Sequence, residues 1–476
     1  MYKIFMKKFF LFLLFVILLN CASIFVCFKL GYIKQEDIQK VANVVLEKTK
    51  MNKKEIEKKV ETTIQNTKED IQEKIANQIA KQPKDVKIIA TLGKEGWKNI
   101  PEYCENGADI FRINGSHIKN AKQMQDTIDG IKEFTKDNRC KNIDAMYDTQ
   151  GPEIRILISE NNSKKSKKNK KGKNTKKQNS YVIKNEDVLI IHTNLKDKEM
   201  NSFVETDGRK TIHVGVNYED FIKDVKKNMI ITIENRIVYA RVEEIDLEKK
   251  TVKVMIIEVN TKDGTFKLSD RRHINLIGNP VSQETLTKAD KEYIKMSAMN
   301  GVKYYAISFV RGKEDIQEVK NIIKQVFIEQ NSKLSEEELN KKMKEIMVIA
   351  KIETKQGLDS LNDILTVADG AMVARGDLGA EIPMEEVPYA TSKIITSCKN
   401  LNKFSILATD VLLSLTQQDM VSRNDIYVIS STLNLGVDSI MLSNETAQGD
   451  KGNKAIAELK KHIDYYNKRK INKDYL

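Results

Sequence analysis

The sequence predicts an α/β fold: a (β/α)8 TIM barrel with a small antiparallel β-barrel lid domain inserted after the third strand. Three observations predict it. Short apolar runs of β type recur from residue 86 onward, amphipathic helical stretches separate them, and one interval between runs is far longer than the others. Strands that are apolar on both faces and alternate with helices indicate a parallel sheet covered on both sides.

The apolar runs are the expected barrel strands. They lie at residues 86–92, 108–114, 143–149, 303–309, 347–352, 370–375, 404–409 and 439–443. Eight such units favour a closed barrel over a doubly wound open sheet. Gly107, Gly301 and Gly436 stand shortly before three of these runs, where a left-handed helix C-cap is expected.

The long interval should hold the inserted domain, over residues 156–279, between barrel parts at 86–155 and 280–476. Runs such as YVIK, VLIIH and IVYARV are separated there by clusters of Asn, Asp, Gly and Lys, a pattern typical of a small antiparallel β domain. Because the insert follows the C-terminal end of a barrel strand, we expect it to act as a lid over the mouth of the barrel.

The 476-residue chain has a formal charge of +13, and nine lysines of one segment supply most of it. That segment, residues 161–180, contains no acidic or apolar residue, so we expect a disordered surface loop. Nucleic-acid binding would need an aromatic platform or a basic face on a folded element, and neither is present. We therefore expect no nucleic-acid partner; a membrane-tethered protein whose loop binds RNA or acidic lipid is the alternative from another class.

The N-terminal region predicts a targeting function. Residues 9–28 are uncharged and mostly apolar, as in a signal segment or a membrane anchor over residues 1–30, and residues 31–85 form a charged helical spacer or transit-like region. Five scattered cysteines predict free thiols in a reducing compartment. Together these features predict an organelle reached through the secretory pathway, such as an apicomplexan plastid. The alternative is a signal-anchored protein that contacts a membrane through residues 9–28.

Polar side chains follow the expected strands, at the end of the barrel where such folds place their chemistry. Arg112 and Lys351 provide positive charge, and Glu353 and Asp377 provide hard oxygen ligands. This combination suits an anionic substrate bound to Mg²⁺. The sequence contains neither a Walker motif nor a kinase Gly-rich loop, so side chains and the metal would have to hold any phosphate.

From about Asp85 to Ile463 the chain resembles the pyruvate kinase family. The resemblance rests on strings that occur in order around the whole barrel, of which DTQGPEIR and DGAMVARGDLG are the most specific; the others are KIIATLG, FRINGSH, INLIG, AISFVR, AKIE, LAT and IMLSNETAQG. It implies phosphoryl transfer from phosphoenolpyruvate to ADP, giving pyruvate and ATP at the last step of glycolysis. It also implies dependence on Mg²⁺ (or Mn²⁺) and K⁺.

The resemblance also implies roles for single residues. Glu353 and Asp377 would bind Mg²⁺, Lys351 and Arg112 would neutralise charge on the transferring phosphoryl, and Thr409 would lie near the carbon that is protonated. The implied substrate contacts are Ser308, Lys351, Gly376, Asp377 and Thr409; the implied nucleotide contacts are Asn114, His117, Arg155 and Arg272; and the implied K⁺ site is Asn114, Ser116, Asp148 and Thr149. Glu153 matches the form of the family associated with K⁺ dependence.

The chain also departs from the family pattern. The lid turn, commonly Asp-Asp-Gly, reads Glu234, Asn235, Arg236, while Gln150 replaces a lysine and Gly115 a phenylalanine. Most members continue into a C-terminal α/β domain that carries the effector site and part of the subunit contacts, so we expect no sugar-phosphate regulation of that kind here. A homo-oligomer is compatible with the sequence, and the usual tetramer is not a firm expectation. An inactive pyruvate kinase-like protein and a different barrel enzyme for pyruvate-like acids are the remaining alternatives.

Overall fold

The computed structural model describes residues 85–472 except 94–95, 135, 141–142, 159–179, 197–201, 278–280 and 448–450. Residues 84–468 form one compact unit. The predicted signal or anchor segment, the spacer up to residue 84 and nearly all of the lysine-rich loop lie outside the described residues. Within the described part, no helix is both long and apolar enough to cross a bilayer.

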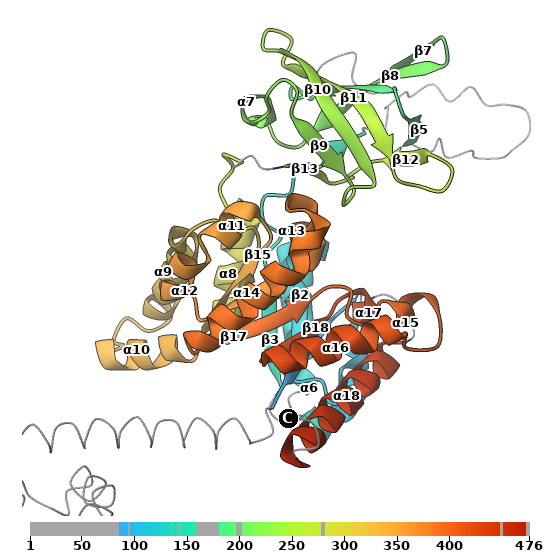
Figure 1. Cartoon of the computed structure of the whole chain (residues 1–476). Helices are drawn as coiled ribbons and strands as arrows, with labels where there is room; N and C mark the ends of the chain where they lie inside the picture. Colours follow the sequence, from blue (N-terminus) through green and yellow to red (C-terminus); the bar gives the residue numbers. More distant parts are fainter. Residues whose placement is uncertain are drawn as a thin grey trace, which may run out of the picture. The chain divides into compact units, whose positions relative to one another are not determined.

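The predicted barrel is confirmed: eight parallel strands close on themselves (Figure 1). In chain order they are β1 (Lys87–Thr91), β2 (Ile110–Asn114), β3 (Asp144–Asp148), β14 (Tyr304–Ile307), β15 (Met347–Ile352), β16 (Gly370–Ala374), β17 (Phe404–Ala408) and β18 (Ser439–Leu442). Each strand pairs with its neighbours in the chain, and β1 also pairs with β18, so the barrel has no open edge.

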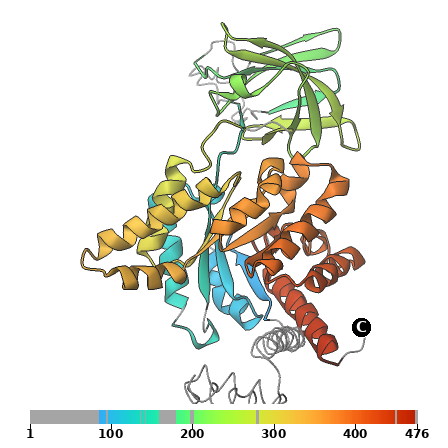
Figure 2. The same cartoon turned by 60° about the vertical axis from the view of Figure 1, so that its left-hand side comes forward.

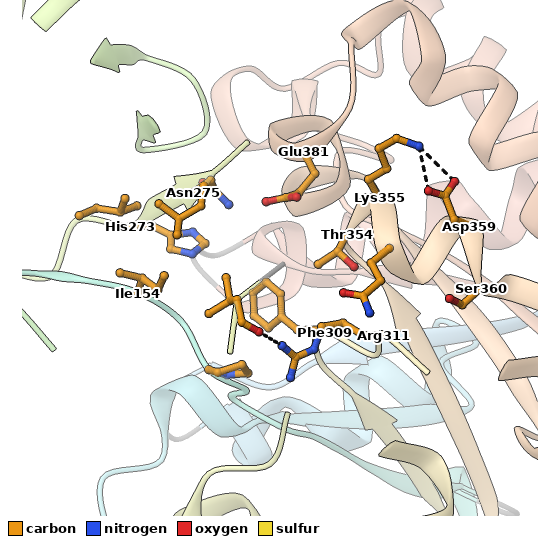
Figure 3. Close-up of a pocket in the computed structure, with 15 residues that line it drawn as sticks. Ile154, His273, Asn275, Phe309, Arg311, Thr354, Lys355, Asp359, Ser360 and Glu381 are labelled. Carbon is orange, nitrogen blue, oxygen red and sulfur yellow. Dashed lines mark hydrogen bonds and ion pairs between the residues drawn. The ribbon is translucent and has the colours of Figure 1, made fainter. Parts of the chain in front are cut away.

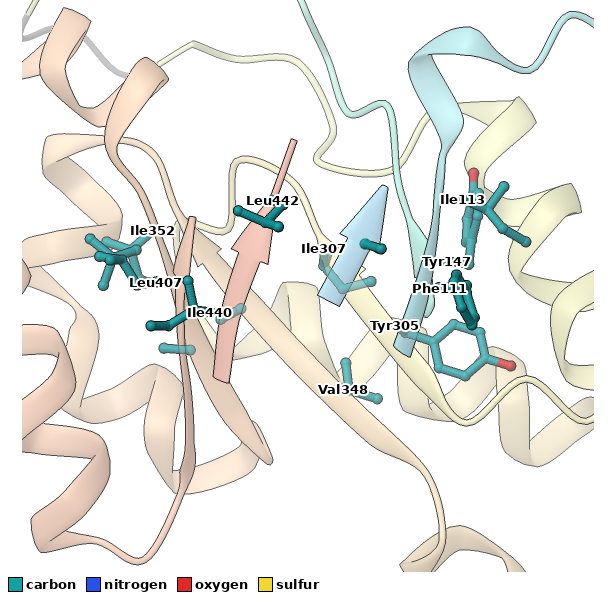
Figure 4. Packing of buried hydrophobic residues seen from close by; sticks show 14 of the residues in the cluster. Phe111, Ile113, Tyr147, Tyr305, Ile307, Val348, Ile352, Leu407, Ile440 and Leu442 are labelled. Carbon is teal, nitrogen blue, oxygen red and sulfur yellow. The ribbon is translucent and has the colours of Figure 1, made fainter. Parts of the chain in front are cut away.

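Successive residues of each strand face opposite sides of the sheet. Ile89, Ile110 and Met146 belong to a cluster to which every barrel strand contributes, which fills the interior. Their neighbours Phe111 and Tyr147 belong to a larger cluster between strands and helices (Figure 4). Burying one such side chain contributes about 1.5–3 kcal/mol, which explains why these strands are apolar on both faces.

Helices cover the outside of the strands (Figure 2). The α-helices of the barrel are α5 (Ile100–Glu105), α6 (Ala121–Phe134), α8 (Lys288–Met299), α9 (Lys313–Gln330), α10 (Glu336–Lys344), α11 (Lys355–Asp359), α12 (Leu361–Val367), α13 (Arg375–Glu381), α14 (Val387–Asn400), α15 (Ser414–Gln417), α16 (Arg423–Leu435), α17 (Asn444–Ala447) and α18 (Gly452–Asn472). Short 3-10 turns are η1 (Gly96–Asn99), η2 (Gly115–His117), η3 (Asn138–Cys140) and η4 (Met384–Glu386). Gly107, Gly301 and Gly436 have φ values of 101°, 77° and 86°, as the sequence predicted for helix ends.

The helix cap of α8 fixes the point where the chain leaves the barrel for the insert. Thr287 and Asp290 form a capping box, which satisfies free N–H groups of the first helical turn. The buried carboxylate of Asp290 also accepts hydrogen bonds from the backbone N–H groups of Gln150 (2.8 Å) and Gly151 (3.1 Å). The loop after β3 is therefore held by a helix that begins more than a hundred residues later in the chain.

The first and last strands meet at a seam. The N–H of Thr91 donates to Oγ1 of Thr446 over 2.9 Å, and that hydroxyl donates back to the carbonyl of Thr91 over 3.0 Å. The hydroxyl of Tyr103 donates to the carbonyl of Thr446 over 3.0 Å. All three side chains are buried, so water does not compete for these hydrogen bonds, which help to close the barrel.

The inserted β domain has its own core of buried Ile, Val, Leu and Phe side chains. Its strands are β4 (Ile156–Leu157), β5 (Ser180–Lys184), β6 (Val188–His192), β7 (Phe203–Thr206), β8 (Arg209–Val216), β9 (Ile230–Ile233), β10 (Val238–Asp246), β11 (Thr251–Val259), β12 (Thr265–Ser269) and β13 (Ile274–Leu276), with one short helix, α7 (Phe221–Asp224). The main sheet has the order β13-β9-β10-β11-β6-β8-β4, and β12 pairs with β5. The expectation of a purely antiparallel domain needs one correction, because β6 and β8 are parallel.

The expectation of free thiols is wrong for two cysteines. Cys104 of α5 and Cys140 of η3 form a disulfide. They are 36 residues apart in the sequence, and their Cα atoms lie 5.2 Å apart once the barrel has folded. Sequence spacing carries no signal for such a pair, whereas Cys398 is a buried free thiol, as expected. Cys21 and Cys27 lie outside the described residues.

Candidate active site

A polar cavity of about 400 Å³ opens at the C-terminal ends of the barrel strands. Its walls come from the loops after β2, β3, β14 and β15, from α13 and from the two segments that connect the β domain. The lining residues are Arg112, Asn114, Ser116, His117, Gln150, Glu153, Arg155, Arg271, Ser308, Phe309, Lys351, Glu353 and Asp377. Most of the residues that the sequence singled out therefore share one cavity.

A buried carboxylate holds two cations beneath this cavity. Asp148, at the end of β3, is fully buried and accepts hydrogen bonds from Nε of Arg112 (2.6 Å) and Nζ of Lys351 (2.9 Å). Burial opposes ionisation of Asp148, but Arg112 and Lys351 outweigh it and lower its pKa. Asp148 therefore holds both basic side chains in place.

Lys351 lies where three elements meet. Besides Asp148, its Nζ contacts Oγ of Ser308 at 2.7 Å and Oε1 of Glu353 at 3.0 Å. Burial disfavours the ammonium, yet Asp148 and Glu353 more than compensate, and the pKa of Lys351 is raised. The ammonium is thus a permanent positive charge, held in one position at the bottom of the cavity.

Glu353 and Asp377 are the two carboxylates that this positive charge does not fully balance. Burial raises the pKa of Glu353 to about 7, against the opposing effect of Lys351. Burial also raises the pKa of Asp377. The Oε2 atom of Glu353 accepts from the backbone N–H of Phe309 over 2.7 Å, which orients the carboxylate. Glu353 is buried, whereas the side chain of Asp377 is 33% exposed at the cavity wall. Two neighbouring carboxylates whose ionisation is disfavoured would be stabilised by an additional cation.

The donor set fits a hard divalent cation that completes its coordination with substrate oxygens. In the part of the chain that the structure describes, no three or more His, Cys, Asp or Glu side chains are arranged to hold a metal by themselves. Mg²⁺ is usually bound by one or two carboxylates and keeps its other positions for water and phosphate oxygens. Glu353 and Asp377 are sufficient for such a site.

The remaining predicted substrate residues lie beside α13. The backbone N–H of Gly376 donates to Oγ1 of Thr409 over 3.1 Å, while Thr409 Oγ1 donates to the carbonyl of Ala408 over 2.7 Å. Gly376 and Thr409 do not line the cavity, but they flank Asp377, which does. Phe309 and Thr409 have φ values of 54° and 62°, so β14 and β17 end earlier than the sequence predicted.

Of the predicted K⁺ ligands, Asp148 is the centre of the buried cluster, and Asn114, Ser116 and Thr149 lie at the ends of the same two strands, β2 and β3. Asn114 pairs in register with Asp148, and its Oδ1 accepts from the N–H of Ser116 over 3.2 Å. Thr149 is buried, and its Oγ1 accepts from the N–H of Ser308 over 2.9 Å. A Cβ at Gly115 would lie 2.7 Å from the carbonyl oxygen of Asp148 and 3.0 Å from the hydroxyl of Tyr147. The surrounding atoms therefore leave no room for a side chain at Gly115, which explains why a glycine stands here where the family has a phenylalanine.

The connecting segments bring further charges to the cavity. Glu153 and Arg155 form an ion pair, and Arg155 also donates to the carbonyl of Arg271 over 2.7 Å. Nδ1 of His273 lies 3.8 Å from Oδ1 of Asp377, and burial lowers the pKa of His273, so the ring is neutral near neutral pH. These contacts join the β domain to the helix that carries Asp377.

One predicted nucleotide residue does not line the cavity. Arg272 pairs with Glu234 over 3.1 Å and lies 5.3 Å from the centre of the Phe266 ring. Its neighbour Arg271 lines the cavity instead. Arg271 and Phe309 line the cavity but are not among the residues predicted from the sequence. The adjacent arginines at 271 and 272 could have indicated Arg271, whereas no sequence pattern indicates Phe309.

The fold and site define a (β/α)8-barrel protein with an inserted β domain and a mouth suited to a polyanion with a divalent cation. The family model for the pyruvate kinase barrel domain matches residues 83–456. The chain belongs to the pyruvate kinase family.

Similar proteins support this membership. The pyruvate kinase of Thermotoga maritima is 32% identical over 381 residues, covering 79% of this chain and 70% of that protein. Pyruvate kinase isozyme G, chloroplastic, of Nicotiana tabacum is 31% identical and covers 79% of this chain, which spans 57% of that relative. Plastidial pyruvate kinase 3, chloroplastic, of Arabidopsis thaliana is 32% identical, and the matching region covers 56% of its length.

A solved structure shows the same fold. A pyruvate kinase from Cryptosporidium parvum matches with a TM-score of 0.66 at 22% identity, covering 81% of this chain and 70% of that one. At this identity the likeness concerns the fold alone.

We predict that Glu353→Gln stabilises the protein at pH 8 in the absence of divalent cations. A carboxyl whose pKa rises from 4.5 to about 7 on folding contributes stability below the lower value and loses it as the pH rises through the higher one. The amide mimics the protonated form, so the free energy of unfolding should rise by roughly 1–2 kcal/mol at pH 8 and change little at pH 5.

Thermal denaturation at the two pH values measures this effect. Glu337→Gln, at an exposed position of α10, is the matched control and should leave the melting temperature unchanged at both. A lower melting temperature for Glu353→Gln at pH 8 would show that the burial of this carboxylate is already fully compensated.

Proposed function

We propose that this chain catalyses the pyruvate kinase reaction, transferring a phosphoryl group from phosphoenolpyruvate to ADP. The observation that carries the proposal is the fixed ammonium of Lys351, held by Asp148 and placed beside the carboxylates of Glu353 and Asp377. The chain spans little more than half the length of the plant relatives, so the activity of those longer proteins is a proposal for this one.

The proposed substrate is a phosphorylated carboxylate, and the cavity offers positive charge to it. Lys351 and Arg112 would contact the equatorial oxygens of the phosphoryl group, whose charge develops during transfer. A divalent cation between Glu353 and Asp377 would supply charge neutralisation and would bind substrate oxygens. The neutral His273 leaves the carboxylate of Asp377 available for that cation.

The chain's own residues would then complete the reaction. The phosphoryl group leaves the enol oxygen and bonds to a terminal phosphate oxygen of ADP, and the enolate takes up a proton at its methylene carbon to give pyruvate. Thr409, hydrogen-bonded to Gly376 and Ala408, is proposed to position the proton donor. Asn114, His117 and Arg155, on the β2 and β3 sides of the cavity, are the proposed nucleotide contacts, with Arg272 as a fourth.

Lys351→Ala should reduce kcat by at least about a thousandfold. It removes the positive charge that stabilises the negative charge developing on the phosphoryl oxygens in the transition state. A coupled assay of ADP phosphorylation with phosphoenolpyruvate measures it. Lys341→Ala, at an exposed position of α10, is the matched control and should retain wild-type activity. Equal rates for wild type and Lys351→Ala would refute the role of Lys351, and an inactive wild type would favour a pseudoenzyme.

We further propose a K⁺ site formed by Asn114, Ser116, Asp148 and Thr149. Neutral oxygens together with one carboxylate suit a monovalent cation, and Glu153 occupies the nearby connecting segment. K⁺ should raise kcat at least about tenfold over tetramethylammonium, which is too large for such a site. Equal turnover with the two cations at matched ionic strength would exclude the site.

For localisation we propose an organelle, supported by the plastid-type names of two relatives and by the apolar segment at residues 9–28. The proposed route is the secretory pathway to a plastid of the apicomplexan kind. A fluorescent fusion of residues 1–85 should then accumulate in that organelle. Retention of the fusion on the endoplasmic reticulum membrane would instead indicate a signal anchor.

A further inference from the structure

We infer that Arg236 is a latch that docks the β domain onto the helix carrying Asp377. Arg236 lies in the turn between β9 and β10, and its guanidinium donates to two carbonyls at the end of α13. Nε donates to the carbonyl of Ala380 over 3.2 Å, and one terminal nitrogen donates to the carbonyl of Ile382 over 2.7 Å. Arg236 does not line the polar cavity, so we regard it as a positioning residue.

The end of α13 is a suitable acceptor for this side chain. The last carbonyls of a helix lack partners within the helix and carry partial negative charge. The planar guanidinium presents several N–H groups in a fixed fork, so it can bond to two of these carbonyls at once. Glu381 lies between the two acceptors in the chain; burial and Asp377 raise the pKa of its carboxyl to about 7, and the charge of Arg236 opposes them.

The turn itself carries a backbone cost that the latch offsets. Glu234, Asn235 and Arg236 have φ values of 53°, 49° and 67°, three left-handed residues in succession without a glycine. Side chains other than Gly are disfavoured in this conformation. A costly residue at a position where glycine would be easier indicates that its side chain has a function.

The turn also contacts the connecting segment at residues 272–276, which leads from the β domain back to the barrel. The N–H of Glu234 donates to the carbonyl of His273 over 3.0 Å, and the carboxylate of Glu234 pairs with Arg272 over 3.1 Å. His273 in turn lies beside Asp377 at the start of α13. The β domain therefore contacts both ends of this helix, through a connecting segment at one end and through Arg236 at the other.

Polar contacts hold the connecting segments to the barrel around a second cavity. This cavity has a volume of about 340 Å³, and the guanidinium of Arg311, which lines it, donates to Oγ1 of Thr285 over 3.0 Å. Figure 3 shows Ile154, His273 and Asn275 on one side of it and Glu381 and Thr354 across from them. Arg236 bridges the domains beside this space.

The latch deepens the proposed function, since docking would hold the β domain over the same cavity, but its test is read without substrates. Arg236→Gly removes both hydrogen bonds while relieving the left-handed backbone. In the full-length protein, measured by hydrogen–deuterium exchange, the amides of residues 376–382 and 272–276 should exchange about tenfold faster. Exchange elsewhere in the barrel should stay the same.

Arg236→Lys and Arg241→Ala are the companion variants. The lysine keeps the charge but cannot span both carbonyls, so it should give an intermediate increase in exchange, and it serves if the glycine variant does not fold. Arg241 is paired with Glu243 on the surface of the same domain, and its loss should change nothing at α13. Unchanged exchange at residues 376–382 in Arg236→Gly, or an equal increase in Arg241→Ala, would overturn the latch. Absence of pyruvate kinase turnover would leave the exchange result intact, so the two proposals fail separately.

Discussion

The buried carboxylate of Asp148 is the constraint on which the arrangement of the barrel mouth depends. Taking charges out of water is expensive, and such a group is tolerated only where its partners are close and well directed. Asp148, Arg112 and Lys351 satisfy one another because β2, β3 and β15 bring their ends to one place. Removal of Asp148 would leave Arg112 without its buried partner and Lys351 with Glu353 alone, so the strands, the capping box of α8 and the loop after β3 are constrained together.

Glu353 and Asp377 show the opposite arrangement. Their ionisation is disfavoured in the folded protein, and the fold accepts that cost instead of surrounding them with further basic groups. Such an imbalance is common where function requires a group that the apoprotein would rather neutralise. The same barrel thus contains one charge cluster that is complete in itself and another that is completed from outside.

Local sequence patterns were sufficient to predict the barrel strands, the glycine helix ends and the position of the insert, because period and turn chemistry act over a few residues. Because (β/α)8 barrels place their functional residues at the C-terminal ends of the strands, Arg112, Lys351, Glu353 and Asp377 could be predicted to lie together. The family motifs added roles for single residues that periodicity cannot supply. What the sequence could not reveal depends on long-range placement. Three features depend on how separate segments meet in the folded chain. They are the disulfide between Cys104 and Cys140, the parallel pairing of β6 with β8, and the presence of Arg271, not Arg272, in the cavity wall.

The seam between β1 and β18 has a consequence for how the chain reaches its folded state. Thr91 of β1 is hydrogen-bonded to Thr446 of α17, 355 residues later and directly after β18. The sheet therefore cannot close until the last strand of the barrel is present. Contacts of such separation are slow to form and leave an unpaired strand edge exposed meanwhile. A chain threaded through a translocation pore from its N-terminus would therefore present β1 and β2 early, and the other edge of β1 would have no partner strand until β18 follows.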